Sequence, residues 1–195
     1  MFSNISKTVL LHVSHDNENL FYNHLSWDDY STWSGTVASY NIYRAVDGVF
    51  DPVPFDNVSA TTRFYTDDVQ DFVSAQGKFS YYVEAVEGGG NVYGFSDVAS
   101  SNTADAYVEV NVFVPNAFAP KGINRVWLPI AQYVEKTDYK VMVFDRWGTK
   151  VFETHSDTEG WSGNGATDEV YVYIIEYKNA RGEYIQLKGH LNIVR

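Results

Sequence analysis

The chain has 195 residues, of which 45% are hydrophobic and 16% aromatic, and its formal net charge is −11. This length suffices for one or two domains with buried cores. The strong negative charge, with no basic stripe, argues against binding to nucleic acids or to anionic membrane surfaces. No run approaches the roughly 20 apolar residues of a membrane-spanning helix, so we expect no direct membrane insertion. The absence of Cys excludes disulfides, thiolate nucleophiles and Cys-ligated metals.

The charge is divided unevenly along the chain. Residues 1–106 contain fourteen acidic and four basic residues, whereas residues 107–195 contain eleven and ten. Such a shift predicts two domains, 1–106 and 107–195. The acidic surplus of the first domain is typical of a solvated surface, and it also leaves open an attraction for cations.

The first half reads as short strands separated by turns, which is typical of a sandwich. Strands are predicted at Leu25–Trp27, Ser39–Arg44 and Arg63–Asp68, with an irregular connection after Val46 because Gly48, Pro52 and Pro54 interrupt strand pairing. The first 13 residues lack the basic leader and cleavage site of a signal peptide, so any export signal is expected upstream.

The clearest alternation in this half follows at Phe79, Tyr81, Val83 and Ala85, which predicts one apolar strand face. Glycines 88–90 with Asn91 predict a hairpin, whose return strand is expected from Val92 through Phe95 to Val98. The polar residues 101–106 predict a linker.

These segments, LSWDDY, YNIYRA, FYTDD and FSYYVEAVEGGGNVYGFSDVAS, resemble a fibronectin type III domain over residues 6–103. The resemblance implies a seven-stranded sandwich with Trp27 and Tyr40 in its core. Phe79 occupies the position of the family's tyrosine corner, so either Tyr81 replaces that corner or it is absent. Such modules are usually spacers, and the pattern of core and turn residues indicates fold more than function.

The second half also predicts strands in order. Tyr139, Val141 and Val143 share one strand face, the segment 145–148 predicts a tight turn, and 150–153 is the return strand. Residues 170–177 are almost continuously apolar, which predicts a central strand covered on both faces. The final strand is expected at 188–195. The fold class is therefore all-β, with two tandem β-sandwich domains, the second of them small and Ig-like.

The segments VPNAFAPKGINRVWLPI, YKVMVFDRWGTKVFET, GWSGNG and DEVYVYIIEYKNARGEYIQLKGHLNIVR occur in this order, in a match that runs from about Val112 to the final residue. They resemble the gliding-motility-associated C-terminal domain of Bacteroidetes proteins, the type B sorting signal of the type IX secretion system. One departure is residues 121–123, where the family usually has an Asn-Gly-Asp-Gly turn; without a carboxylate there, no cation site is expected. The resemblance suggests these sorting or partner-binding residues: Pro115, Asn116, Phe118, Asn124, Trp127, Asp145, Arg146, Trp147, Gly148, Trp161, Gly163, Tyr171, Lys188, Gly189 and Arg195.

The resemblance implies a secreted or cell-surface protein with a secretory signal peptide upstream. It implies two partners, the outer-membrane type IX translocon and a membrane protein of the PorP/SprF kind, and an extracellular location at the outer-membrane surface. The turn 145–148 is the leading contact candidate. The competing interpretation places Trp147 in the core, as the burial preference of aromatic residues favours.

No catalytic residue and no cofactor are predicted. The histidines have neither a Cys partner nor an HExxH or GxSxG frame, and residues 160–165 lack the Lys-Ser/Thr end of a phosphate-binding loop; the histidines are His12, His15, His24, His155 and His190. No metal site is assigned, although weak calcium binding stays open at two groups of acids, namely Asp28 with Asp29, and Asp67 and Asp68 with Asp71. The alternative function is a glycan-binding or adhesive module, in which Trp33 stacks on a sugar ring.

Overall fold

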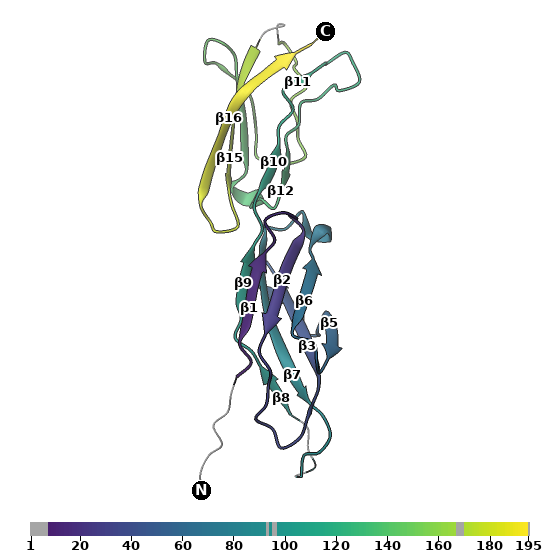
Figure 1. Ribbon diagram of the computed structural model, residues 1–195. Helices are drawn as coiled ribbons and strands as arrows, with labels where there is room; N and C mark the ends of the chain where they lie inside the picture. The colour runs from purple at the N-terminus through teal and green to yellow at the C-terminus, as the bar shows by residue number, and fades with distance from the viewer. Residues whose placement is uncertain (1–7, 93, 95–96, 167–169, 195) are drawn as a thin grey trace. The chain divides into compact units, whose positions relative to one another are not determined.

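The computed structural model describes residues 8–92, 94, 97–166 and 170–194. Strands dominate it, with two three-residue 3-10 helices among the described residues, so the all-β class is confirmed (Figure 1). Neither of these short helices has the length or apolar content to cross a membrane. The chain divides into two compact units: a first unit of residues 1–72 and 78–108, and a second of residues 73–77 and 109–195.

The first unit contains two sheets. One has the order β1-β2-β6, and the other is built on the long strands β3 and β7. Short strands pair with successive parts of these two: β4 and β5 with β3, and β8 and β9 with β7. The elements are β1 (Leu11–His15), β2 (Tyr22–Trp27), β3 (Val37–Val46), β4 (Val49–Phe50), β5 (Asp56–Ser59), β6 (Phe64–Asp68), η1 (Gln70–Phe72), β7 (Lys78–Glu87), β8 (Val98–Ser100) and β9 (Ala104–Tyr107).

The core of the first unit follows the predicted alternation. Phe79, Tyr81, Val83 and Ala85 are all fully buried along β7. Trp27 from β2 contacts Tyr40 from β3 with 5.7 Å between ring centroids, which joins the two sheets. The two-sheet sandwich and the buried positions of these aromatic residues agree with the predicted fold.

Three local predictions in the first unit were wrong or incomplete. The predicted linker at 101–106 overlaps β9, which pairs with β7 from Lys78 to Tyr81. In β9, Asp105 lies on the exposed face of the strand, while Ala106 lies on the buried face. The return strand of the hairpin begins at Val98 rather than Val92, and residues 93, 95 and 96 lie outside the described part of the chain. The irregular connection after Val46 contains the short strands β4 and β5.

Tyr81 does not form a tyrosine corner to the main chain. Its hydroxyl donates to Asp67 Oδ2 at 2.7 Å and accepts a hydrogen bond from Asn23 Nδ2 at 2.8 Å. Arg44 Nη1 lies 2.6 Å and 2.8 Å from the two carboxylate oxygens of Asp67. Burial and the Asp67 carboxylate raise the pKa of Tyr81, so the hydroxyl stays a hydrogen-bond donor. A buried polar network therefore joins strands of both sheets.

The second unit has a five-stranded sheet in the order β11-β16-β15-β13-β14 and a two-stranded sheet β10-β12. All pairs in the larger sheet are antiparallel except β11 with β16. The elements are β10 (Asn111–Phe113), β11 (Ala117–Phe118), β12 (Ile130–Gln132), η2 (Lys136–Asp138), β13 (Lys140–Phe144), β14 (Lys150–Thr154), β15 (Val170–Lys178) and β16 (Tyr184–Ile193).

Burial in the second unit confirms the strand predicted at 139–143, because Tyr139, Val141 and Val143 are at most 1% exposed. The prediction that residues 170–177 are covered on both faces was wrong. In β15, Tyr171 and Ile175 are buried, whereas Ile174 on the opposite face is only partly buried. The smaller sheet and the adjoining loops supply core contacts on one face of the larger sheet. The final strand begins at Tyr184, four positions earlier than predicted.

Candidate partner-binding surface

Several of the predicted sorting residues form the core of the second unit. Phe118, Trp127, Trp161 and Tyr171 are at most 4% exposed. The Trp161 ring lies 4.8 Å from Tyr171 and 5.6 Å from Phe118, measured between centroids. Trp127 and Trp161 also exchange main-chain hydrogen bonds of 2.9 Å and 2.8 Å. The tertiary structure brings these residues together from separate segments, and their role in this geometry is packing.

Three other predicted residues act through their main chain. The Trp127 indole Nε1 donates to the Pro115 carbonyl at 2.6 Å. The Asn116 carbonyl accepts a hydrogen bond from the Asn192 N–H at 2.9 Å, which joins β16 to the segment beside β11. The Asn124 carbonyl accepts a hydrogen bond from an N–H in the preceding loop at 2.9 Å. The bond between Asn116 and Asn192 holds the entry to the domain against its last strand.

Two of the predicted glycines are required by close packing. A Cβ atom at Gly189 would lie 2.3 Å from the Tyr173 hydroxyl oxygen, which belongs to the directly opposite residue on β15. A Cβ atom at Gly163 would lie 3.0 Å from the Phe118 ring. Lys188 is exposed on β16, and Arg195 lies outside the described residues.

The turn at residues 145–148 is the exposed part of the predicted set. Trp147 is 79% exposed, so the interpretation that placed it in the core was wrong. Asp145 Oδ1 accepts hydrogen bonds from the N–H groups of Trp147 and Thr149 at 2.9 Å and 2.8 Å. Gly148 takes φ +80°, which a residue with a side chain adopts only with strain. The turn is thus held by its own hydrogen bonds and presents the indole outward.

The Arg146 guanidinium carbon lies 5.0 Å from the centroid of the Trp147 ring, within the range of a cation–π contact. This contact pairs an apolar surface with a planar cation at the tip of the turn. Trp and Arg are the residue types most enriched among energetically dominant interface residues. The turn therefore has the chemistry of a protein-binding anchor, and its contact with a partner stays a prediction.

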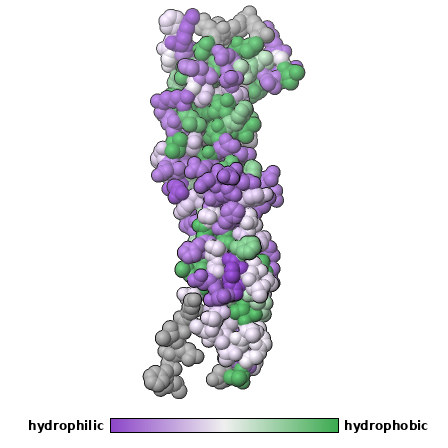
Figure 2. Space-filling view, viewed as in Figure 1, coloured by the Kyte–Doolittle hydropathy of each residue, from purple (hydrophilic) through white to green (hydrophobic). Residues whose placement is uncertain are grey.

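A pocket of about 320 Å³ adjoins the turn. A second hollow of about 440 Å³ shares residues 164–166 with it and adds Lys121 and Arg125 to its rim. Near this rim Ile123 is fully exposed and Val126 is 48% exposed, and Figure 2 shows hydrophobic residues reaching the surface of the second unit. The first pocket is lined by Asp145, Arg146, Trp147, Val151, Trp161, Asn164, Gly165, Ala166 and Tyr171.

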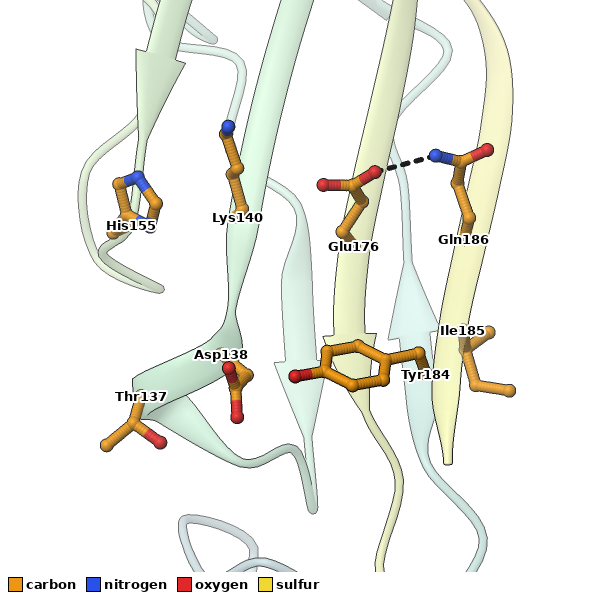
Figure 3. A pocket seen from close by; sticks show the side chains of 8 residues that line it. All are labelled: Thr137, Asp138, Lys140, His155, Glu176, Tyr184, Ile185 and Gln186. Atoms are coloured by element: carbon orange, nitrogen blue, oxygen red, sulfur yellow. Dashed lines mark hydrogen bonds between the residues drawn. The ribbon is translucent and has the colours of Figure 1, made fainter. Parts of the chain in front are cut away.

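A larger hollow of about 550 Å³ lies on the outer face of the five-stranded sheet, and the sequence pattern did not indicate it. Figure 3 shows Lys140, Glu176 and Gln186 side by side on neighbouring strands. Glu176 accepts a hydrogen bond from Gln186 at 2.7 Å, and Asp138 forms an ion pair with Lys178 at 2.6 Å. The hydrogen bond to Asp138 raises the pKa of Lys178. Both carboxylates have partners, as expected of a solvated sheet face.

One member of each acidic pair of the first unit forms an ion pair with an arginine. Asp67 binds Arg44, and Asp29 forms an ion pair with Arg63. Within the described ranges, no group of three or more His, Asp or Glu side chains is arranged to hold a metal ion. Trp33, the predicted sugar platform, is partly buried and packs on Tyr30 with 4.4 Å between ring centroids.

Residues 112–193 match the family model of the CHU_C type IX secretion signal domain. This match confirms the sorting-domain resemblance for the C-terminal part of the chain. A type IX secretion signal implies interaction with the secretion machinery and export to the cell surface or the extracellular space. No curated protein matches the chain.

Several solved structures are similar at low identity. The FN1–FN3 domains of chicken CNTN1 match at 11% identity and TM-score 0.35, covering 96% of this chain and 65% of that one. A tetra-tandem repeat from the extending region of a large adhesion protein matches at 12% identity and TM-score 0.39, covering 96% of this chain and 50% of that one. A Ca²⁺-stabilised adhesin of an ice-binding Antarctic bacterium matches at 9% identity and TM-score 0.33, covering 97% of this chain and 49% of that one. The chain thus spans between 49% and 65% of these structures.

Proposed function

We propose that residues 107–195 are a type B sorting signal, which directs a secreted protein across the outer membrane and attaches it to the cell surface. The match to the type IX secretion signal domain over residues 112–193 supports this proposal most directly. The partners proposed are the outer-membrane translocon and a PorP/SprF-like membrane protein. A secretory signal peptide upstream of this segment would take the protein across the inner membrane.

The first unit is proposed to be a spacer without enzymatic activity. Its central polar network, Arg44, Asp67 and Tyr81, is hydrogen-bonded internally. Buried groups satisfied in this way stabilise a core, whereas a catalytic group must face a substrate. The sandwich therefore supports a role in holding the sorting domain away from the rest of the protein.

The transport experiment fuses residues 107–195 behind a secretory signal peptide and a fluorescent reporter. In a type IX-competent cell this fusion is expected to reach the cell surface, because the family-model match lies within these residues. Residues 1–106 in the same position are the matched control and are expected to stay in the periplasm. Surface fluorescence after protease shaving measures both. Periplasmic retention of the first fusion, with all partner proteins present, contradicts the sorting assignment.

The turn 145–148 is proposed as a contact with the partner, and Trp147→Ala and Arg146→Ala test it. Trp147 is 79% exposed, so its removal is expected to change the free energy of unfolding by only about 0.5 kcal/mol. Loss of an anchoring Trp or Arg is expected to weaken binding by about 2 kcal/mol. The measurements are the melting temperature, the affinity for the purified PorP/SprF-like protein and surface display.

The matched control for this turn is Phe113→Ala, which removes another exposed aromatic side chain, 62% exposed, on β10. This variant is expected to keep both stability and binding. Unchanged binding by the two turn variants removes the turn from the interface. Lost binding together with a lowered melting temperature would show that the turn is structural.

A further inference from the structure

The last strand of the second unit has one unpaired edge. On one side, β16 pairs with β15 from Tyr184 to Asn192 without a register shift. On its other side, β11 pairs only with Asn192 and Ile193. Within the part of the chain that the structure describes, residues 184–191 therefore have no strand beside them on this edge.

The direction of the main-chain groups along this edge follows from two hydrogen bonds. The N–H groups of Asn192 and Val194 donate to the carbonyls of Asn116 and Phe118, each at 2.9 Å and on the side away from β15. Because main-chain groups alternate direction along a strand, the N–H groups of Gln186, Lys188 and His190 point to the same side. No described residue accepts a hydrogen bond from these three N–H groups.

This edge differs from that of β14, at the other end of the same sheet. The five residues of β14 are interrupted by a register shift opposite Val143 and Phe144. Bulges and short strands are the usual means by which proteins prevent pairing at sheet edges. The β16 edge is longer, and its pairing with β15 has no register shift. Its geometry is that of a template for a further strand.

We propose that the edge of β16 from Tyr184 to Leu191 binds an extended segment of a partner protein as an added strand. Main-chain hydrogen bonds to Gln186, Lys188 and His190 would supply the affinity, as in other cases of strand addition. The proposal deepens the proposed function and rests on it only for the assignment of the partner to the secretion machinery. It adds a second contact on β16, which β15 separates from β13, the strand that leads into the turn 145–148.

Charge indicates which segment fits this edge. Lys188 is exposed, and its neighbour across the pairing with β15 is the apolar Ile174. Lys188 forms no ion pair with any described residue. An acidic side chain on the incoming strand, placed opposite Lys188, would form a favourable cross-strand pair. The partner segment is therefore an extended strand that carries acidic residues among β-branched ones.

The test uses the full chain, labelled with ¹⁵N, and two capped peptides of alternating sequence, one of Val and Glu and one of Val and Lys. Amide hydrogen exchange is measured residue by residue. The Val/Glu peptide is expected to slow exchange at Gln186, Lys188 and His190 and to leave the turn at Trp147 unchanged. The Val/Lys peptide is expected to bind about tenfold more weakly because its charges repel Lys188.

Three substitutions of Lys188 distinguish the contribution of main-chain hydrogen bonding from that of the side-chain charge. Lys188→Pro removes an N–H that does not pair with β15, and it is expected to weaken Val/Glu binding at least tenfold, roughly the loss of one or two hydrogen bonds. Lys188→Ala keeps the N–H and is expected to lose only a fewfold in affinity. Lys188→Glu is expected to reverse the preference between the peptides. This reversal does not depend on whether the proline variant folds.

Several results would overturn the proposal. One is unchanged exchange at the edge amides at saturating Val/Glu peptide, and another is full binding by a folded Lys188→Pro variant. A third is a dimer whose formation protects the same amides without any peptide, since the occupant would then be a second copy of the chain. Peptide binding is measured on the purified chain, so failure of the reporter fusion to be exported would count against the sorting function alone.

Discussion

Trp127→Ala is expected to lower the free energy of unfolding of the second unit by about 4 kcal/mol. The indole is completely buried, its Nε1 donates to the Pro115 carbonyl at 2.6 Å, and its ring lies 5.4 Å from that of Tyr173. Truncation removes a large apolar surface, leaves a cavity and removes the hydrogen-bond donor to a partly buried carbonyl. Because the chain has two units, the measurement is denaturant unfolding followed by NMR signals assigned to each unit.

The matched control is Trp127→Phe, which retains most of the apolar surface and loses the indole hydrogen bond. It is expected to cost about 2 kcal/mol. The signals of the first unit are expected to unfold at an unchanged denaturant concentration in both variants. An alanine variant within about 1 kcal/mol of the wild type would contradict the packing role assigned to Trp127.

Asp67→Ala is expected to destabilise the first unit by about 4 kcal/mol, because it leaves the Arg44 charge buried without its carboxylate. The guanidinium carbon lies 4.5 Å and 4.3 Å from the ring centroids of Phe55 and Phe72, so the cation cannot turn to solvent without disturbing both rings. Thermal unfolding followed by signals of the first unit measures the loss.

Two variants separate the ion pair from the rest of this network. Tyr81→Phe removes one hydroxyl, which donates to Asp67 and accepts from Asn23, and is expected to cost about 1 to 2 kcal/mol. Arg44→Met combined with Asp67→Leu removes both charges and is expected to recover most of the stability lost in Asp67→Ala. If the double variant is as unstable as Asp67→Ala, packing rather than the unpaired charge accounts for the loss.

The predictions that the structure confirms depend on local patterns. The alternation from Phe79 to Ala85 placed four side chains on one face, and all four are buried. The turn at 145–148 was expected from its Gly and polar residues, and Gly148 takes the positive φ that such a turn requires. Strand period and turn chemistry are properties of neighbouring residues, so they can be read directly from the chain.

The wrong predictions concern features that depend on contacts between residues distant in sequence. The polar residues 101–106 lack a strong alternation, yet part of this segment pairs with β7 because that strand has an edge available. In β15 the apolar run predicted burial on both faces, but the second sheet lies on one side only. Both outcomes depend on what another segment covers, and a single stretch of sequence does not contain that information.

The sequence by itself determined the all-β class, the order of the sorting motifs and the residue types of the candidate surface. The period of apolar residues, the turn residues and the motif spacing are all local properties of the sequence. Only the tertiary structure decided that Trp127 and Trp161 are packing residues, that Trp147 is exposed, and that β16 keeps an open edge. Exposure and strand pairing are set by contacts between segments distant in sequence. The same aromatic residue in a turn can therefore be a core residue or a surface anchor, according to whether another segment covers it.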